Sequence, residues 1–536
     1  MMRQFILLSS FRIAAAHFAA AFWQAGSEIV LGAEPALLLK NQTNPRYFSD
    51  GTKAVYLTGQ HIPTNFNDWA GCPIIDFAAF TDNMVAKNHN FLRLWALDAP
   101  FVYHLDGTGG AVTPTPFLRT GPGFAADGLP KFDLSQLNQD YFDRLQARVK
   151  EAGDKGIYVS VMLTAGIFVE NANNFSYSMY NPANNIHSAL ASLTNLAQYT
   201  LTNSAWVAYM DAYVDKVVDT LQKSNNILYE VSNEAQLNTS EWQDHVMQRI
   251  RLREFRHKSK RHFVGKTAYG FNASDSAINT DLLAGSADWV SLAGRTGATY
   301  TTAVANAPAT KVSILDTDHI WGFTIPAAAR VPWVWKSFTR GHNPIYITPQ
   351  TGYAGGFSHY PEIENALGHA KRLADRTDLS YLVPSNDLAS TGYCLASPNI
   401  EYVVYQPNNS TFTVTLPARN FDYEWINPNT GVTTEQGTFR ATSGNRTFTL
   451  PSGHSSGVLY LKLARPRITG IELNGQQMLL QALGDPHTTY RLETSTSVRG
   501  SFDTESSVTS DASGAFTHDH TSEETTQRRF YRIAFP

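Results

Sequence analysis

Between residues 54 and 348, short runs of apolar residues alternate with longer segments that have helical periodicity. Eight apolar runs occur, at 54–58, 91–95, 156–163, 227–234, 262–265, 289–292, 311–315 and 344–348. Such runs are typical of parallel strands that are buried on both faces. Helical patterns occupy segments that include 141–152, 205–223 and 361–376. Eight strand–helix units over about 300 residues predict an α/β fold, a (β/α)8 TIM barrel.

A doubly wound open sheet is the alternative arrangement of alternating strands and helices. It predicts fewer units and usually a glycine-rich phosphate-binding turn after the first strand. The sequence that follows the first apolar run contains no such turn. The pattern therefore favours the closed barrel, which we expect to occupy residues 34–382.

Beyond residue 376 the periodicity changes to that of short, alternating strands. The expected strands are 401–405, 411–416, 423–426, 446–450 and 458–462. Turn clusters separate these segments, which is typical of a β-sandwich, here expected at 383–465. Pro466 marks a break. Residues 466–536 then contain further strand segments, at 489–493 and 528–533, and predict a small β-rich accessory module.

The N-terminal segment has the features of an export signal. Arg3 precedes an apolar stretch and Arg12 interrupts it. Small residues follow this stretch up to Ala33. This predicts a signal peptide at 1–33 and a secreted or periplasmic protein. No later segment has the roughly 18 apolar residues that a membrane span requires.

Composition narrows the classes of function without selecting one. Hydrophobic residues make up 43% of the chain and charged residues 16%, as in a globular protein. The net charge of −4 provides no basic field for nucleic acid or an anionic membrane. Cys72 and Cys394 form no metal or redox motif, and their sequence positions leave open whether they pair or stay free.

Candidate functional residues stand where the predicted strands end, because TIM barrels carry function at the carboxyl ends of their strands. The candidates are His61, Arg93, Trp95, Asn233, Glu234, Asp316, Asp318, His319, Trp321 and Trp335. Glu234 and Asp316 end strands four and seven, on opposite sides of the ring. Two facing carboxyl groups, one protonated and one ionised, are what glycosidic hydrolysis requires.

Other chemistries have weaker support in this sequence. Asp316, Asp318 and His319 are types of residue that bind metals, but no further His or Cys stands at ligand spacing. No Gly-x-Ser-x-Gly turn indicates a serine nucleophile. We therefore expect no metal and no other cofactor.

The Asn233-Glu234 pair at the end of strand four resembles that of glycoside hydrolase clan A, the cellulase-like TIM barrels. The resemblance implies that Glu234 is the acid/base, that Asn233 binds the sugar 2-hydroxyl and that Arg93 supports a strand-seven nucleophile. The clan nucleophile is usually Glu, whereas this chain has Asp316 and Asp318. Asp316 is preferred because it directly follows the strand, and Asp318 is the alternative. The clan implies retention of configuration, and a wider carboxyl separation would indicate inversion.

Four longer stretches are similar to apiosidase-like, DUF-type barrels that carry a sandwich labelled collagen-binding. They are 44–51 (NPRYFSDG), 316–322 (DTDHIWG), 333–344 (WVWKSF and RGHNP) and 423–431 (YEWINPNTG). This resemblance covers about residues 35–465, and its motifs are much less specific for substrate than for the family. Our first hypothesis is a hydrolase that acts on plant or algal polysaccharides or oligosaccharides. His61, Trp95, Asp318, His319, Trp321 and Trp335 are then expected to contact the substrate.

A second hypothesis retains the TIM-barrel fold but assigns no catalytic activity to the protein. In it the chain is a secreted glycan- or matrix-binding protein built on a TIM barrel. The C-terminal modules could attach the protein to a glycan or a surface under either hypothesis. Turnover on a broad panel of glycans separates the two.

Overall fold

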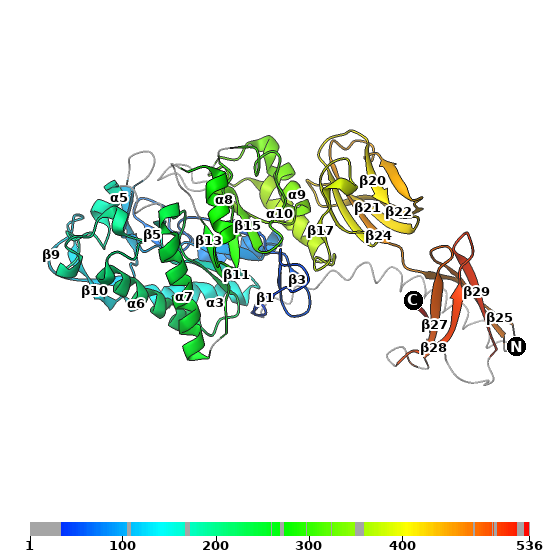
Figure 1. Cartoon of the computed structure of the whole chain (residues 1–536), viewed down its shortest axis with the longest axis horizontal. Helices are drawn as coiled ribbons and strands as arrows, with labels where there is room; N and C mark the ends of the chain where they lie inside the picture. The colour runs from blue at the N-terminus through cyan, green and yellow to red at the C-terminus, as the bar shows by residue number, and fades with distance from the viewer. Residues whose placement is uncertain are drawn as a thin grey trace.

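The computed structural model describes residues 34–103, 109–166, 172–258, 260–267, 273–295, 297–322, 324–348, 359–474, 477–495, 497, 501–521 and 530–534. The predicted signal peptide, residues 1–33, lies outside the described residues. Figure 1 shows three parts that follow one another along the chain, a barrel, a β-sandwich and a small β module.

The first part is a closed barrel of eight parallel strands, in the order β11-β12-β13-β14-β15-β16-β4-β6. The strands are β4 (Gly59–His61), β6 (Phe91–Leu94), β11 (Tyr158–Met162), β12 (Ile227–Glu230), β13 (Val264–Thr267), β14 (Trp289–Ser291), β15 (Val312–Asp316) and β16 (Asn343–Ile347). The last strand, β16, pairs with the first, β4, and so closes the ring. The predicted (β/α)8 barrel is confirmed.

The first barrel strand is displaced from its predicted position. Residues 54–58 were expected to form it, but β3 (Ala54–Val55) pairs antiparallel with β2 (Phe48–Ser49). The backbone N–H of Leu57 donates to the side chain of Asn343 at 3.0 Å, and the Thr58 hydroxyl donates to the carbonyl of Pro344 at 2.6 Å. At Leu57 and Thr58, hydrogen bonds between side chains and backbone groups thus replace the backbone–backbone bonds of a strand ladder. The barrel strand therefore begins at Gly59.

Helices cover the outside of the barrel. They are α2 (Phe77–Ala86), α3 (Gln139–Asp154), α6 (Ser204–Leu221), α7 (Ser240–His257), α8 (Asp275–Ala284), α9 (Arg330–Thr339) and α10 (Pro361–Ala374). The short helix α5 (Ala172–Tyr177) lies in the connection between β11 and α6. The three helices predicted from periodicity correspond to α3, α6 and α10. Asn138 and Asn203 cap α3 and α6 by accepting backbone N–H groups, as Asn does at helix N-termini. None of the described helices combines the length and hydropathy that a bilayer crossing requires.

Short strands lie outside the barrel in its N-terminal half. They are β1 (Leu39–Lys40), β2 and β3 in one sheet, β5 (Asp68–Trp69), β7 (Phe101–Tyr103) and β8 (Gly109–Thr113) in another, and the hairpin of β9 (Phe117–Phe124) with β10 (Pro130–Leu137). In sequence, β5 lies between the first and second barrel strands, and β7, β8 and the hairpin lie between the second and third. These strands lengthen the connections between the first three barrel strands.

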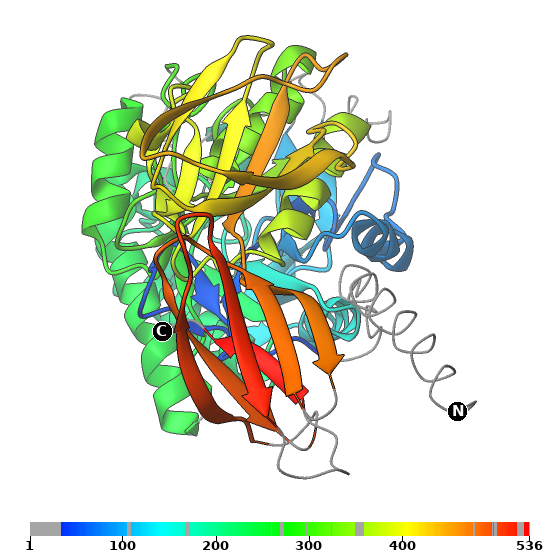
Figure 2. The ribbon, with the colours of Figure 1, turned by 90° about the vertical axis from the view of Figure 1, so that its right-hand side faces the viewer.

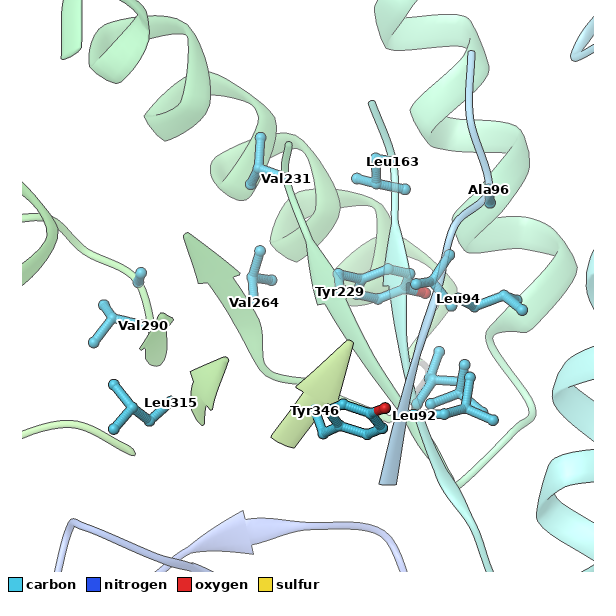
Figure 3. Packing of buried hydrophobic residues seen from close by; sticks show 14 of the residues in the cluster. Leu92, Leu94, Ala96, Leu163, Tyr229, Val231, Val264, Val290, Leu315 and Tyr346 are labelled. Atoms are coloured by element: carbon cyan, nitrogen blue, oxygen red, sulfur yellow. The ribbon is translucent and has the colours of Figure 1, made fainter. Parts of the chain in front are cut away.

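The two-residue alternation of strands separates the outer core from the barrel interior. Leu92 and Leu94 of β6 belong to the large apolar core that lies between the strands and the helices (Figure 3). Phe91 belongs to a separate apolar cluster inside the barrel, together with residues such as Leu228 and Ile314. The next inward positions on these three strands are Arg93, Glu230 and Asp316. The barrel interior therefore changes from apolar to charged along its strands.

The backbone at Gly265 of β13 lies very close to the side chain of Trp289 inside this barrel. A Cβ atom at this position would lie 1.8 Å from the ring of Trp289, which is fully buried on the neighbouring strand. We expect Gly265→Ala to lower the free energy of unfolding by about 1–3 kcal/mol or more, because the core must shift to admit the methyl group. Urea-induced unfolding measures the loss. Gly297→Ala is the control, since a Cβ there meets nothing within 4 Å; equal losses in both variants would contradict this account.

The second part is a β-sandwich. Its six-stranded sheet has the order β17 (Val383–Pro384), β18 (Cys394–Ser397), β19 (Glu401–Gln406), β24 (Gly457–Leu463), β21 (Asn420–Ile426), β22 (Thr433–Arg440), and β20 (Phe412–Leu416) pairs with β23 (Gly444–Phe448). All five predicted strands are present. The longer strand β22 was not predicted, because nearly all its residues are exposed and no apolar alternation marks it. The sandwich contacts the barrel through Arg376, whose guanidinium donates to both carboxylate oxygens of Glu424.

The third part consists of two three-stranded antiparallel sheets, drawn in orange to red in Figure 2. One contains β25 (Arg467–Asn474), β26 (Gln477–Leu483) and β29 (Ala515–Thr521), and the other β28 (Asp503–Thr509), β27 (Thr489–Ser495) and β30 (Phe530–Ala534). This agrees with the predicted β-rich module. Cys72 packs beside the barrel and Cys394 inside the sandwich, so the two thiols do not pair with each other.

Candidate active site

Arg93 joins three strands inside the barrel. Its guanidinium donates to both carboxylate oxygens of Glu230 at 2.9 and 2.6 Å and to Asp316 at 2.7 Å. It also donates to the amide oxygen of Asn233 at 2.8 Å. Although burial opposes its charge, Glu230 and Asp316 hold the pKa of Arg93 above its ordinary value. Strands β6, β12 and β15 are thereby connected by one buried network of charge-assisted hydrogen bonds.

Asp316 ends β15 with both carboxylate oxygens occupied. The Nε2 atom of His61 lies 2.9 and 3.1 Å from them, and the backbone N–H of Asp318 donates at 2.9 Å. The indole N–H of Trp95 donates to His61 Nδ1 at 2.9 Å, so the proton of a neutral His61 stands on Nε2 and points to Asp316. Burial opposes ionisation of Asp316, but His61 and Arg93 outweigh it and hold its pKa well below the usual range.

Glu234 stands opposite, four residues beyond the end of β12, with a strained backbone. Its φ of 50° lies in the left-handed region, which is unusual for Glu and is found mostly at functional sites. Arg295 donates to its Oε1 at 2.8 Å. Burial and the nearby Asp318 nevertheless raise the pKa of Glu234 to about 8. This shift favours the protonated form of the carboxyl group.

Asp318 and His319 lie beside Glu234 on a short 3-10 helix, η4 (Thr317–His319). One ligand atom from each of these three side chains lies within 4.8 Å of the other two. Burial and Asp316 raise the pKa of Asp318, and burial holds the pKa of His319 well below its ordinary value. His319 Nδ1 contacts the hydroxyl of Ser291 at 2.6 Å.

These three groups are also of the kind that binds metals. The guanidinium of Arg295 provides a positive charge beside them. It lies 2.8 Å from the carboxylate of Glu234 and 3.9 Å from that of Asp318. Arg295 thus faces both carboxyl groups, an arrangement that is compatible with acid/base chemistry at this cluster.

The aromatic candidates have different positions. Trp95 is buried and orients His61, as described above. Trp321 is half-buried and packs edge-on against Trp333. Trp335 lies elsewhere: it is fully buried on α9, and its indole N–H donates to the carbonyl of Pro428 in the sandwich at 3.1 Å. Trp335 was predicted to contact the substrate. Its position instead connects the barrel to the sandwich and does not support that prediction.

Sequence reasoning missed Arg295, which contacts Glu234 and also donates to the carbonyl of Asp318 at 2.6 Å. Arg295 follows β14, the sixth barrel strand, by four residues. Its position near the carboxyl end of the sixth strand is the sequence signal that could have identified it. Glu230, the last residue of β12, is the carboxylate that pairs with Arg93.

No protein-family model matches the chain, and no curated protein matches it. Among solved structures, a protein described as a glycoside hydrolase aligns with a TM-score of 0.53 at 13% identity, over 80% of this chain and 97% of its own. A glycoside hydrolase family 5 protein from Bacteroides vulgatus ATCC 8482 aligns with a TM-score of 0.54 at 14% identity, over 80% and 94%. At these identities the likeness shows a shared fold, a TIM barrel with C-terminal β-structure.

Proposed function

We propose that the protein is a glycoside hydrolase with Glu234 as its acid/base. The observation that carries the proposal is the opposite perturbation of two carboxyl groups across the barrel. The pKa of Glu234 is raised to about 8, whereas that of Asp316 is held well below its usual range. Environments that separate two carboxyl pKa values in this way assign one group as acid and keep the other ionised.

The proposed reaction proceeds with retention of configuration. Glu234 donates its proton to the glycosidic oxygen while a carboxylate at the end of β15 attacks the anomeric carbon. The leaving alcohol departs with the proton of Glu234, and a glycosyl ester forms. Glu234, now ionised, then removes a proton from water, which hydrolyses the ester. The chain's resemblance to clan A supports this course, and so does the close approach of Glu234 and Asp318.

The identity of the nucleophile depends on which strand-seven Asp reaches the substrate. The sequence favours Asp316, and that assignment stays a prediction. The side chain of Asp316 has 0% exposure and both oxygens hydrogen-bonded, whereas that of Asp318 has 7% exposure. An oxygen of Asp318 lies within 4.8 Å of Glu234, and retaining enzymes place the two groups about 5–5.5 Å apart. We therefore propose that Asp318 attacks, although burial and Asp316 raise its pKa, because Arg93, 3.5 Å from its carboxylate, and Arg295 favour its ionised form. The ionised Asp316 then holds Arg93 and the η4 backbone in position.

Product release from a panel of plant and algal polysaccharides tests this proposal. We expect cleavage by the wild type and strong losses in Asp316→Asn and Asp318→Asn. Added azide should restore turnover in Asp318→Ala and yield a glycosyl azide of inverted configuration, because azide attacks from the vacated face. Rescue of Asp316→Ala instead would return that role to Asp316. Glycan binding without cleavage would favour the binding-protein alternative.

The proposed substrate class is plant or algal polysaccharide or its oligosaccharides. The resemblance of the chain to apiosidase-like barrels supports this choice. The predicted export signal would place the activity outside the cytoplasm, and the C-terminal modules would attach the enzyme to a glycan or a surface. Fractionation of the producing cells and binding of the wild-type enzyme to insoluble polysaccharide test these two extensions.

The pH dependence of kcat/KM follows from the protonation of Glu234. The acid must carry its proton, so activity should fall as pH rises through about 8. The charge of Arg295 lowers the pKa of Glu234, so Arg295→Gln should move this alkaline limb to higher pH. Lys150→Gln, which removes a distant surface cation, should leave the limb in place. A limb that moves to lower pH in Arg295→Gln would contradict the assignment.

A further inference from the structure

Two histidines and one glutamate of the C-terminal module converge between its two sheets. His518 and His520 lie two residues apart on β29, so their side chains point to the same face. Glu505 comes from β28, which belongs to the other three-stranded sheet. Figure 1 shows β28 and β29 within the same small module. The three side chains therefore connect elements that no backbone ladder joins.

The spacing of these groups matches that of ligands around one small cation. One ligand atom from each residue lies within 4.8 Å of the other two. His518 Nε2 is 3.3 Å from Glu505 Oε1, and His520 Nδ1 contacts the same oxygen. Zinc–nitrogen and zinc–oxygen bonds of roughly 2.0–2.2 Å in a tetrahedron place ligand atoms about 3.3 Å apart. In a tetrahedral site, His520 Nδ1 would stand farther from Glu505 Oε1 than in the observed contact.

The carboxylate of Glu505 supplies an independent observation. Its Oε2 atom is buried and has no hydrogen-bond partner in the described part of the chain. A buried carboxylate oxygen without a partner is costly, and such atoms usually indicate a missing water or ion. Among the ion pairs of the described residues, Glu505 pairs with His518 and His520 and with no Lys or Arg. A metal ion would satisfy both the oxygen and the negative charge.

The module also has few other means of stabilisation. It spans about 70 residues, a size at which a single apolar core is seldom sufficient and disulfides or metals are commonly added. Neither cysteine of the chain lies beyond residue 394, so no disulfide can form within it. Among its described residues, the buried apolar core consists of Met478, Leu480, Ala482, Tyr490, Leu492 and Phe516. A link between the two sheets would therefore have a large effect on this module.

We infer that Glu505, His518 and His520 form a zinc-binding site that cross-links the two sheets of the C-terminal module. Two imidazoles and a carboxylate are ligands that Zn²⁺ prefers. Their side chains are 14–17% exposed, so the ion can enter from solvent, and a water molecule completes the tetrahedron. The site is separate from the barrel and does not depend on the function proposed there.

Zinc binding to the untagged full-length protein tests this inference. After removal of metals with a chelator, the protein is dialysed against ZnCl2 at low micromolar concentration, and bound zinc is measured by mass spectrometry. We expect one equivalent in the wild type and in Glu234→Gln, which alters the other candidate cluster. The double variant His518→Ala/His520→Ala should lose that equivalent. His487→Asn is the matched control, because it removes an exposed imidazole from the same module and Asn tolerates the left-handed backbone at this position.

Hydrogen exchange separates a structural site from surface adsorption. Zinc should slow amide exchange in β28 and β29 at least tenfold, and a chelator should reverse the effect. Glu505→Gln, which keeps the shape of the side chain, should weaken zinc binding at least tenfold and remove the protection, even if the double variant fails to fold. Equal zinc in Glu505→Gln and the wild type, or bound zinc without slower exchange in these strands, would overturn the inference.

Discussion

The variant Glu234→Gln is expected to lose 10²- to 10⁴-fold in kcat/KM on natural polysaccharides, the range that general acid catalysis contributes. Gln keeps the size of the side chain but carries no transferable proton. The hydrogen bond from Arg295 can still reach the amide oxygen, so the fold of the site should be preserved. Steady-state rates on the substrate found in the panel measure the loss.

A substrate with a better leaving group provides the discriminating control. An aryl glycoside whose phenol is acidic needs little protonation, so Glu234→Gln should lose much less in the bond-breaking step on that substrate. Glu241→Gln, an exposed change in the first turn of α7, should retain wild-type rates. Equal losses on both substrates would show that Glu234 has a structural role, and wild-type turnover would exclude it as the acid.

The variant Arg93→Met is expected to destabilise the barrel by about 3–5 kcal/mol, the usual cost of removing one partner from a buried ion pair. The change leaves the carboxylates of Glu230 and Asp316 inside the barrel without their cation. Both side chains have 0% exposure, so water cannot replace the lost interactions. Thermal or urea unfolding of the barrel measures the difference.

The dependence of this loss on pH identifies its cause. The carboxylate of Asp316 is uncompensated only while ionised, so the deficit of Arg93→Met should shrink as pH falls and Asp316 becomes protonated. Lys150→Met removes an exposed pair with Asp154, whose side chains are 71% and 55% exposed, and should change stability by less than about 1 kcal/mol. A loss for Arg93→Met that is equally small would show that the network contributes little.

The parts of the structure that the sequence predicts best are those set by local pattern. Seven of the eight barrel runs contain or overlap their strands, because buried parallel strands are apolar throughout. The first run differs because the hydrogen bonds of Leu57 and Thr58 go to residues about 286 positions away. Strand β22 has no local apolar signal, since its environment is largely solvent. Contacts distant in sequence leave no mark on local periodicity.

The same distinction applies to the site. Strand ends directed attention to His61, Arg93, Glu234 and the strand-seven carboxylates, and the barrel fold brings these residues close together. Whether Asp316 or Asp318 faces the substrate depends on one turn of η4, which periodicity cannot describe. Trp335 was misplaced because a helix next to strand eight can turn an aromatic ring either to the barrel mouth or, as here, to the sandwich.

The charged network of Arg93, Glu230 and Asp316 also constrains the order of folding. Its members come from the second, fourth and seventh strands, so the first half of the barrel contains the cation and one carboxylate, and the second half contains only an anion. A C-terminal half-barrel that collapsed alone would enclose Asp316 without a cation. We expect such a fragment to stay hydrated and loosely packed until the N-terminal half docks, which makes ring closure a single cooperative event in which charge neutralisation and core formation coincide.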